Sequence, residues 1–135
     1  MKYNIIIDGN NFFDLEGFYD EMEKLLTKDL TWKPGRNLDA FNDLLRGGFG
    51  VHEYGEILHI TWINFSKSRK DFGYEETEKY YENMLKRCHP SNISRVEKKL
   101  EEVRRHEGQT LLDIILGIIT DSGDSGHWCE LEIEE

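Results

Sequence analysis

The sequence predicts an α/β fold: a small three-stranded parallel sheet covered by helices, with an additional helical insertion. Three short segments have the composition of strands, at residues 3–7, 57–63 and 128–134. Stretches with the period of an amphipathic helix separate these strands along the chain. Strands that alternate with helices favour a parallel sheet. With 135 residues, the whole chain (1–135) is expected to form a single domain.

The three expected strands differ in their polarity. Residues 3–7 include three consecutive isoleucines and end at the turn cluster of residues 8–11, which is typical of a buried strand. Residues 57–63 are rich in β-branched and aromatic side chains. The last strand alternates between glutamates and a second set of residues, namely Cys129, Leu131 and Ile133. Such alternation predicts a strand with one solvated face.

Two helices are expected between the first and second strands. Asp14 can cap the first, whose apolar residues recur every three or four positions as far as Leu26. Residues 29–36 form the expected loop before the second. Asn37 is a good N-cap for that second helix, because its side-chain oxygen can accept a hydrogen bond from a free backbone N–H. Glycines from Gly47 onward stop it.

The rest of the chain is predicted to be largely helical. A short helix is expected at residues 66–72, and a longer one at 74–88 that Pro90 ends. Ser94 and Glu97 have the spacing of a capping box, which would open a further helix. Its narrow apolar stripe could be core or a contact surface, and the pattern favours core: Ile93, Val96, Leu100 and Val103.

Residues 111–119 are apolar nearly all round, so their periodicity fits a strand or a helix. Their length and the Gly108-Gln-Thr110 start favour a buried helix. The loop expected after it covers residues 121–126.

The charge distribution favours a basic partner. The chain carries a net charge of −10, with 11 acids and 6 bases in residues 1–66 and 7 acids without a base in residues 108–135. Residues 67–107 are nearly balanced, with 9 acids and 11 bases. A strongly acidic surface repels nucleic acid and attracts basic proteins, although solubility alone also explains it. We therefore expect no direct binding of nucleic acid.

Other classes of protein are disfavoured by composition. No apolar run is long enough for a membrane span, and the first residues lack the pattern of a signal peptide, so a cytoplasmic protein is expected. Two cysteines, Cys88 and Cys129, do not make a disulfide framework. Together with His89 and His127 they form a poor metal set, because adjacent Cys and His chelate badly. We expect no metal and no cofactor.

Two aspartates in the second helix suggest a binding site. Asp39 and Asp43 are four residues apart, so their carboxylates project from one face, away from the apolar stripe. Two like charges so placed repel by roughly 0.2–0.5 kcal/mol. A cationic partner would make this arrangement favourable. Asp39 alone also has a structural explanation, since acids are favoured in the first turn of any helix.

Residues 35–45, Gly-Arg-Asn-Leu-Asp-Ala-Phe-Asn-Asp-Leu-Leu, resemble the signature of the barstar family of intracellular inhibitors of secreted ribonucleases. The resemblance covers about residues 3–72 and 108–134. Residues 73–107 have no counterpart, which makes them the additional helical insertion. The resemblance implies an inhibitor without catalysis that binds a basic toxin ribonuclease and blocks its active site. Such an immunity protein is expected to be a monomer when free.

The resemblance also implies residue roles. Asp39 and Asp43 match the acidic pair of the inhibitory helix, and Asp43 would be the main anchor, standing in for the scissile phosphate. Asn42 lies where the family usually has an aromatic residue, and Lys33 lies where a loop aromatic normally stacks. The nearest matches to the acids at the end of the last family helix are Asp121 and Asp124.

Two alternatives remain from the sequence. The chain could be an interaction module that kept this fold and lost ribonuclease binding. It could also be an enzyme, because residues 5–11 resemble the first strand of the PIN/NYN metal-dependent nucleases. Asp8, Asp121 and Asp124 would then hold Mg²⁺ for phosphodiester hydrolysis. That alternative requires residues 111–120 to be a strand.

Overall fold

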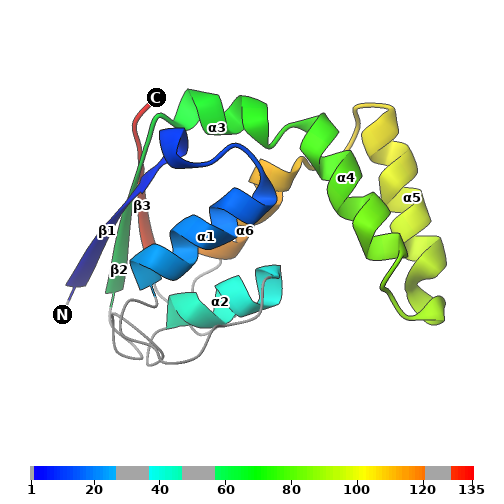
Figure 1. Ribbon diagram of the computed structural model, residues 1–135, viewed down its shortest axis with the longest axis horizontal. Helices are drawn as coiled ribbons and strands as arrows, with labels where there is room; N and C mark the ends of the chain where they lie inside the picture. Colours follow the sequence, from blue (N-terminus) through cyan, green and yellow to red (C-terminus); the bar gives the residue numbers. More distant parts are fainter. Residues whose placement is uncertain (1, 27–36, 47–56, 121–128) are drawn as a thin grey trace.

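The computed structural model describes residues 2–26, 37–46, 57–120 and 129–135 (Figure 1). The loops predicted at 29–36 and 121–126 lie outside these ranges, as does the predicted helix stop at Gly47.

The sheet has three parallel strands in the order β1-β2-β3. They are β1 (Lys2–Asp8), β2 (Ile57–Ile63) and β3 (Cys129–Ile133). In their register, Ile5 lies opposite Ile60, which lies opposite Leu131. The predicted three-stranded parallel sheet is therefore confirmed.

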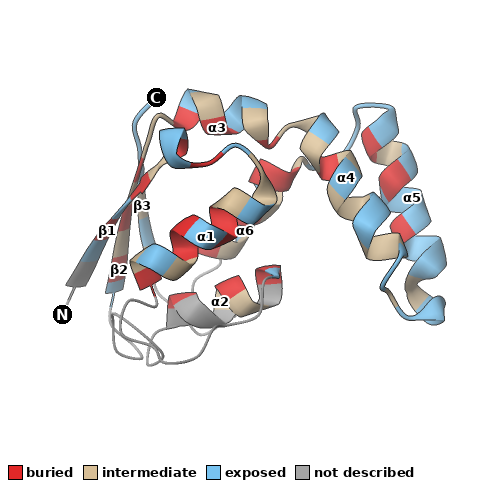
Figure 2. Ribbon diagram, viewed as in Figure 1, coloured by how far each residue is buried: buried red, intermediate tan, exposed pale blue. Residues whose placement is uncertain are grey.

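One face of the sheet is covered and the other is open. The described helices lie on one side of the strands (Figure 1). The side chains facing these helices are buried in β1 and β2, as Figure 2 shows, namely Ile5, Ile7, Leu58, Ile60 and Trp62. On the opposite face, Ile6 is 57% exposed. There His59 lies between Glu130 and Glu132, with nitrogen–oxygen distances of 3.9 and 3.7 Å.

Two capped helices follow β1 and a 3-10 turn, η1 (Gly9–Asn11). Helix α1 (Leu15–Leu26) has Asp14 before it, whose Oδ1 accepts a hydrogen bond from Gly17 N at 2.8 Å. Helix α2 (Leu38–Arg46) has Asn37 before it, whose Oδ1 accepts from Ala40 N at 2.7 Å. Both predicted N-caps are confirmed.

An aromatic cluster forms the centre of the core. Trp62 of β2 is fully buried, and its Nε1 donates to Ser68 Oγ at 3.0 Å. Phe18 stacks on the Trp62 ring with centroids 6.0 Å apart. The other buried phenylalanines close the cluster: Phe12, Phe41, Phe65 and Phe72. Satisfying the indole N–H matters because an unpaired buried donor costs about 1–3 kcal/mol.

Two helices complete the body. Helix α3 (Phe65–Asp71) begins one residue earlier than predicted, and α6 (Leu111–Thr120) confirms the buried helix. At the start of α6, Asp113 N donates to Thr110 Oγ1 at 3.2 Å, and Thr110 N donates to Asp113 Oδ2 at 3.0 Å. Because residues 111–120 are helical, the nuclease alternative is wrong about the strand it requires.

A helical hairpin projects from one side of the body (Figure 1). It consists of α4 (Tyr74–Leu85), a 3-10 turn η2 (Pro90–Asn92) and α5 (Ile93–Arg104). The α5 stripe is buried at Val96, Leu100 and Val103, whereas Ile93 is exposed. These three residues are not part of the main core cluster, so the hairpin has its own small interior.

Two predicted boundaries in the hairpin differ from the structure. Helix α4 ends at Leu85 rather than at residue 88, and turns carry the chain to Pro90. The predicted capping box is wrong, because α5 already begins at Ile93 and Ser94 lies inside it. The 3-10 turn that starts at Pro90 runs directly into α5, which leaves no separate N-cap at Ser94.

None of the helices in the described part of the chain combines the length and the apolar character needed to cross a bilayer. Cys88 and Cys129 are not joined in a disulfide.

Candidate partner-binding surface

Helix α2 is fixed to the body by an apolar stripe. Leu38, Phe41 and Leu45 are buried. The Phe41 ring meets the Phe18 ring of α1 edge-on, with centroids 5.2 Å apart. Rings in this geometry attract each other beyond the effect of their buried area. The cap at Asn37 and this stripe hold the helix as a rigid platform on the surface.

The predicted acidic pair lies on this platform. Positions 39 and 43 are one turn apart within α2, and both side chains lie outside the described part of the structure. The period of the helix places these two positions on the far side from the buried stripe. Their role as partner-binding residues therefore stays a prediction.

Asn42 lies beside the pair but is partly packed against the body. The residue is half-buried, and its Oδ1 has neither solvent access nor a hydrogen-bond partner. A buried acceptor without a partner typically costs about 1–3 kcal/mol. The other predicted contacts, Lys33, Asp121 and Asp124, lie outside the described residues.

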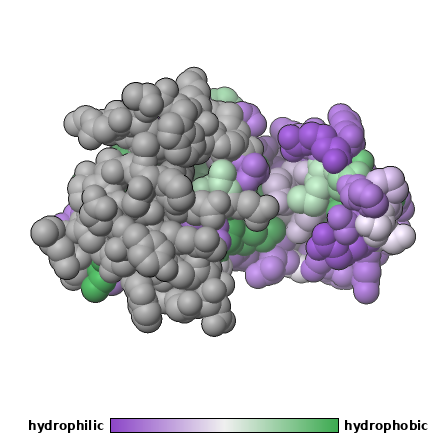
Figure 3. Space-filling view, turned by 90° about the horizontal axis from the view of Figure 1, so that it is seen from below, coloured by the Kyte–Doolittle hydropathy of each residue, from purple (hydrophilic) through white to green (hydrophobic). Residues whose placement is uncertain are grey.

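A groove of about 800 Å³ runs between the body and the hairpin. Its body side comes from α1, from Leu38 at the start of α2 and from Asn37 just before it. Its opposite side comes from α4, including Tyr80 and Met84. Figure 3 views the molecule from below and shows hydrophobic residues between the body and the charged hairpin. No local pattern in the sequence predicts this groove, because its walls come from segments that are far apart along the chain.

Two contacts hold α4 beside the body, and a third closes the base of the hairpin. Glu76 Oε2 accepts a hydrogen bond from Leu15 N at 3.1 Å. Thr77 Oγ1 accepts one from Leu111 N at 2.6 Å in a buried position. At the junction after α5, the rings of Tyr74 and His106 stack with centroids 4.9 Å apart. The groove is thus fixed by contacts at the base of the hairpin.

The carboxylate at the end of β1 is used to build a turn. Asp8 Oδ1 accepts hydrogen bonds from Asn10 N at 2.9 Å and from Asn64 Nδ2 at 2.8 Å. These hydrogen bonds, with a smaller contribution from the charge of Lys67, lower the pKa of Asp8 from its usual value of 3.8. This is the chemistry of a turn after a strand. Within the described ranges, no three His, Cys, Asp or Glu side chains are grouped to hold a metal ion.

Part of the chain matches the model of a known family. The model of the family described as Barstar (barnase inhibitor) matches residues 3–89. The matched range runs from β1 to the turn before Pro90, which is more than half of the chain. It extends through α4, whereas the resemblance seen in the sequence stopped near residue 72 and resumed at 108. No curated protein matches the sequence.

Proposed function

The chain belongs to the barstar family, and from this premise we propose that it inhibits a barnase-type ribonuclease by covering the active site with α2. The family is described by its inhibition of barnase, which makes an inhibitor rather than an enzyme the natural expectation for this chain. The observation that carries the proposal is the anchoring of α2 through Asn37, Phe41 and Leu45.

A rigid helix is a favourable carrier for binding residues. Association costs free energy when flexible groups must be ordered, and a pre-organised helix lowers that cost. In this proposal Asp39 and Asp43 face the ribonuclease, and Asp43 occupies the position of the scissile phosphate. An enzyme that cleaves RNA has a cationic cleft, where a carboxylate can form charge-assisted hydrogen bonds.

The net charge supports the same partner. A chain with a net charge of −10 attracts a basic protein over a distance of about a Debye length, 8 Å at physiological salt. Such attraction raises the association rate more than the final affinity. Raised salt should therefore slow association while leaving dissociation nearly unchanged.

The test uses the full chain and a panel of barnase-type ribonucleases that includes barnase. Cleavage of a fluorogenic RNA is measured with increasing amounts of the chain, and binding kinetics are measured by biolayer interferometry. We expect cleavage to stop at a 1:1 ratio. Asp43→Ala should raise Kd by about 30-fold or more, as for a binding hot spot, chiefly through faster dissociation.

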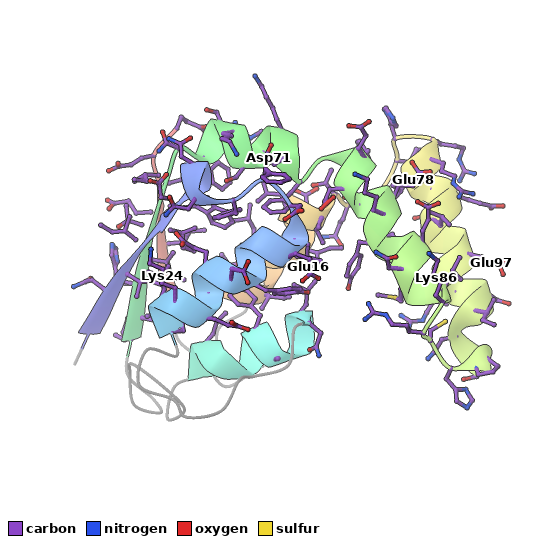
Figure 4. The ribbon with its side chains drawn as sticks, in the orientation of Figure 1. Glu16, Lys24, Asp71, Glu78, Lys86 and Glu97 are labelled. Atoms are coloured by element: carbon purple, nitrogen blue, oxygen red, sulfur yellow. The ribbon has the colours of Figure 1, made fainter. Side chains whose placement is uncertain are left out.

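Glu97→Ala provides the matched control. It also removes one carboxylate, but Glu97 is exposed on α5, on the far side of the hairpin (Figure 4). Its Kd should stay within a factor of about two of the wild type. Equal effects of the two variants would contradict a specific role for α2.

Three other outcomes would overturn the proposal. Binding that leaves RNA cleavage unchanged would favour an interaction module that kept the fold. Cleavage of RNA by the chain itself, dependent on a divalent ion and lost in Asp8→Ala, would favour the nuclease alternative. No binding to any ribonuclease of the panel would also contradict the proposal.

A further inference from the structure

We propose that the groove between the body and α4 is a second contact site for the same ribonuclease, and that it receives an acidic segment carrying an apolar side chain. The inference rests on the proposed function, because it extends the surface around α2. It gives the hairpin a role in recognition that the acidic pair on α2 does not supply.

Size argues that the interface reaches this groove. Helix α2 has nine residues and is therefore about 14 Å long. A stable interface covers about 800 Å² on each partner, which corresponds to a patch about 30 Å across. A protein seated on α2 must then also cover neighbouring surface. At the start of the helix that surface is the groove, whose wall includes Asn37 and Leu38.

The acidic side chains of the groove are largely engaged within the chain. Asp14 caps α1, and Glu76 accepts a hydrogen bond from Leu15 N. Asp71 Oδ2 lies 2.6 Å from Lys67 Nζ. Glu16, which Figure 4 shows on the side of α1 that faces the hairpin, has interactions of its own. These carboxylates keep their negative charge, but part of their hydrogen-bonding capacity is already used within the chain.

The cations of the groove are not so engaged. Lys70, Lys79 and Arg87 line it, and all three side chains are exposed. Within the described part of the chain, none of these three cations forms an ion pair. Among the acids that line the groove, Glu75 is exposed and has no described hydrogen bond or ion pair. The formal charges of the lining sum to −2, but its exposed charged side chains without a described partner are these three cations and Glu75, so the cations are available to pair with a visiting carboxylate.

Apolar and aromatic side chains provide the rest of the lining. Leu15 and Tyr19 come from α1, and Tyr80 and Met84 come from α4. Tyr19 is buried, whereas the other three are half-buried and present part of their surface to the groove. Such a lining fits an aliphatic or aromatic side chain, with a carboxylate beside it that reaches Lys79 or Arg87. We therefore expect the groove to bind a ribonuclease segment that has an apolar side chain next to an acidic one.

A pair of charge reversals tests the sign of this prediction. Lys79→Glu/Arg87→Glu places two acids in the groove. Lys98→Glu/Lys99→Glu makes the same change of charge on α5, where both lysines are exposed, form no described ion pair and do not line the groove. Each variant makes the chain more negative, so long-range attraction to a basic ribonuclease should increase in both.

We expect the two variants to change affinity in opposite directions. The α5 variant should bind as tightly as the wild type or slightly more tightly, through faster association. The groove variant should bind at least about tenfold more weakly, through faster dissociation, because its carboxylates repel the acidic segment. Thermal unfolding of the free proteins should be similar, since all four residues are exposed.

Cys88 gives a second readout that needs no charge change. Its thiol is free and lines the groove. Bound ribonuclease should slow its reaction with N-ethylmaleimide, measured by mass spectrometry of the complex and of the free chain. Wild-type labelling rates in the complex would show that the groove stays open.

The outcomes separate the two proposals. If Asp43→Ala weakens binding while the groove variant matches its α5 control and Cys88 stays reactive, the proposed function holds and the groove inference is wrong. Tighter binding by the groove variant would mean that the groove receives a basic segment, which also overturns the inference. If the wild-type chain binds no ribonuclease, both proposals fail.

Discussion

Glu76 of α4 caps α1 by accepting a hydrogen bond from Leu15 N at 3.1 Å, across 61 positions of sequence. The carboxylate lies at the N-terminus of that helix, where its negative charge also interacts favourably with the helix dipole. One side chain therefore both stabilises the body and holds the hairpin beside it.

The first prediction concerns this cap. Glu76→Ala should lower the free energy of unfolding by about 0.5–2 kcal/mol, the usual cost of losing an N-cap. Glu76→Gln should cost less, because the amide oxygen can still accept the hydrogen bond. Urea denaturation followed by circular dichroism measures both. The neighbouring Glu75→Ala is the control, because Glu75 is exposed and has no described hydrogen bond. If Glu75→Ala lost as much stability as Glu76→Ala, the capping role of Glu76 would be refuted.

A second prediction concerns the buried hydroxyl of Thr77. It donates to Gly73 O at 2.7 Å and accepts from Leu111 N at 2.6 Å, so it joins the first turns of α4 and α6. Thr77→Val keeps the shape but leaves the Leu111 N–H without a partner, at a cost of about 1–3 kcal/mol. Thr77→Ser keeps the hydroxyl and should lose less. A larger loss in Thr77→Ser than in Thr77→Val would show that packing of the methyl group, rather than the hydrogen bond, matters here.

Contacts of this kind explain what the sequence could not predict. The caps at Asp14 and Asn37 were predictable because each donor lies three residues from its acceptor. The contacts of Glu76 with Leu15 and of Thr77 with Leu111 join residues 61 and 34 positions apart, and no local pattern marks such partners. The groove depends on these contacts and was missed for the same reason.

Boundaries of the hairpin were harder to predict than its existence. The apolar stripe at Val96, Leu100 and Val103 correctly indicated a packed helix. The capping-box pattern at Ser94 was misleading, because Pro90 opens a 3-10 turn that leads directly into α5. For the candidate site, the helix that carries positions 39 and 43 was predictable from its cap at Asn37 and its apolar stripe. The groove beside its start was not, because α4, which forms the opposite wall, lies far along the chain.

A third prediction concerns space at Gly9. A Cβ atom there would lie 2.5 Å from Asn64 O and 2.6 Å from Ser68 Oγ. Because Asn64 O belongs to the backbone, it cannot move aside cheaply, and Ser68 is held by its hydrogen bond with Trp62. Gly9→Ala should therefore lower the free energy of unfolding by about 1–3 kcal/mol, as for an overpacked site.

Gly117→Ala is the control for this substitution. Gly117 is exposed within α6 and has nothing within 4 Å of an added Cβ. Alanine is favoured over glycine inside a helix, so this variant should be more stable by about 0.5–1 kcal/mol. Thermal unfolding should thus shift in opposite directions for the two variants. A stabilised Gly9→Ala would contradict the close approach of β1, η1 and α3.

The fourth prediction is a pH dependence that arises from Asp8. Its hydrogen bonds with Asn10 N and Asn64 Nδ2 lower its pKa in the folded state. Its stabilising contribution is then fully present above the unfolded value of 3.8 and is lost as the pH falls through the lower, folded value. Asp8→Asn should be less stable than the wild type at neutral pH, and the difference should shrink as the pH falls below about 4. Denaturant titrations across this range measure the difference, and one that grows on acidification would contradict the assignment.

The last prediction concerns the two thiols. Burial raises the pKa of Cys129 to about 12, so at neutral pH its thiol is protonated as well as poorly accessible. The thiolate is the reactive form, and Cys88, at the edge of the groove, should therefore react with N-ethylmaleimide well before Cys129 does. Mass spectrometry after short labelling near pH 7 should find the adduct on Cys88, and both thiols should react at similar rates in urea. Equal rates in the folded chain would mean that β3 does not hold Cys129 against the core. A slowly reacting Cys129 is also a useful reference in the labelling experiment with bound ribonuclease, because only the labelling rate of Cys88 should change there. Equal rates in the free chain would remove that reference.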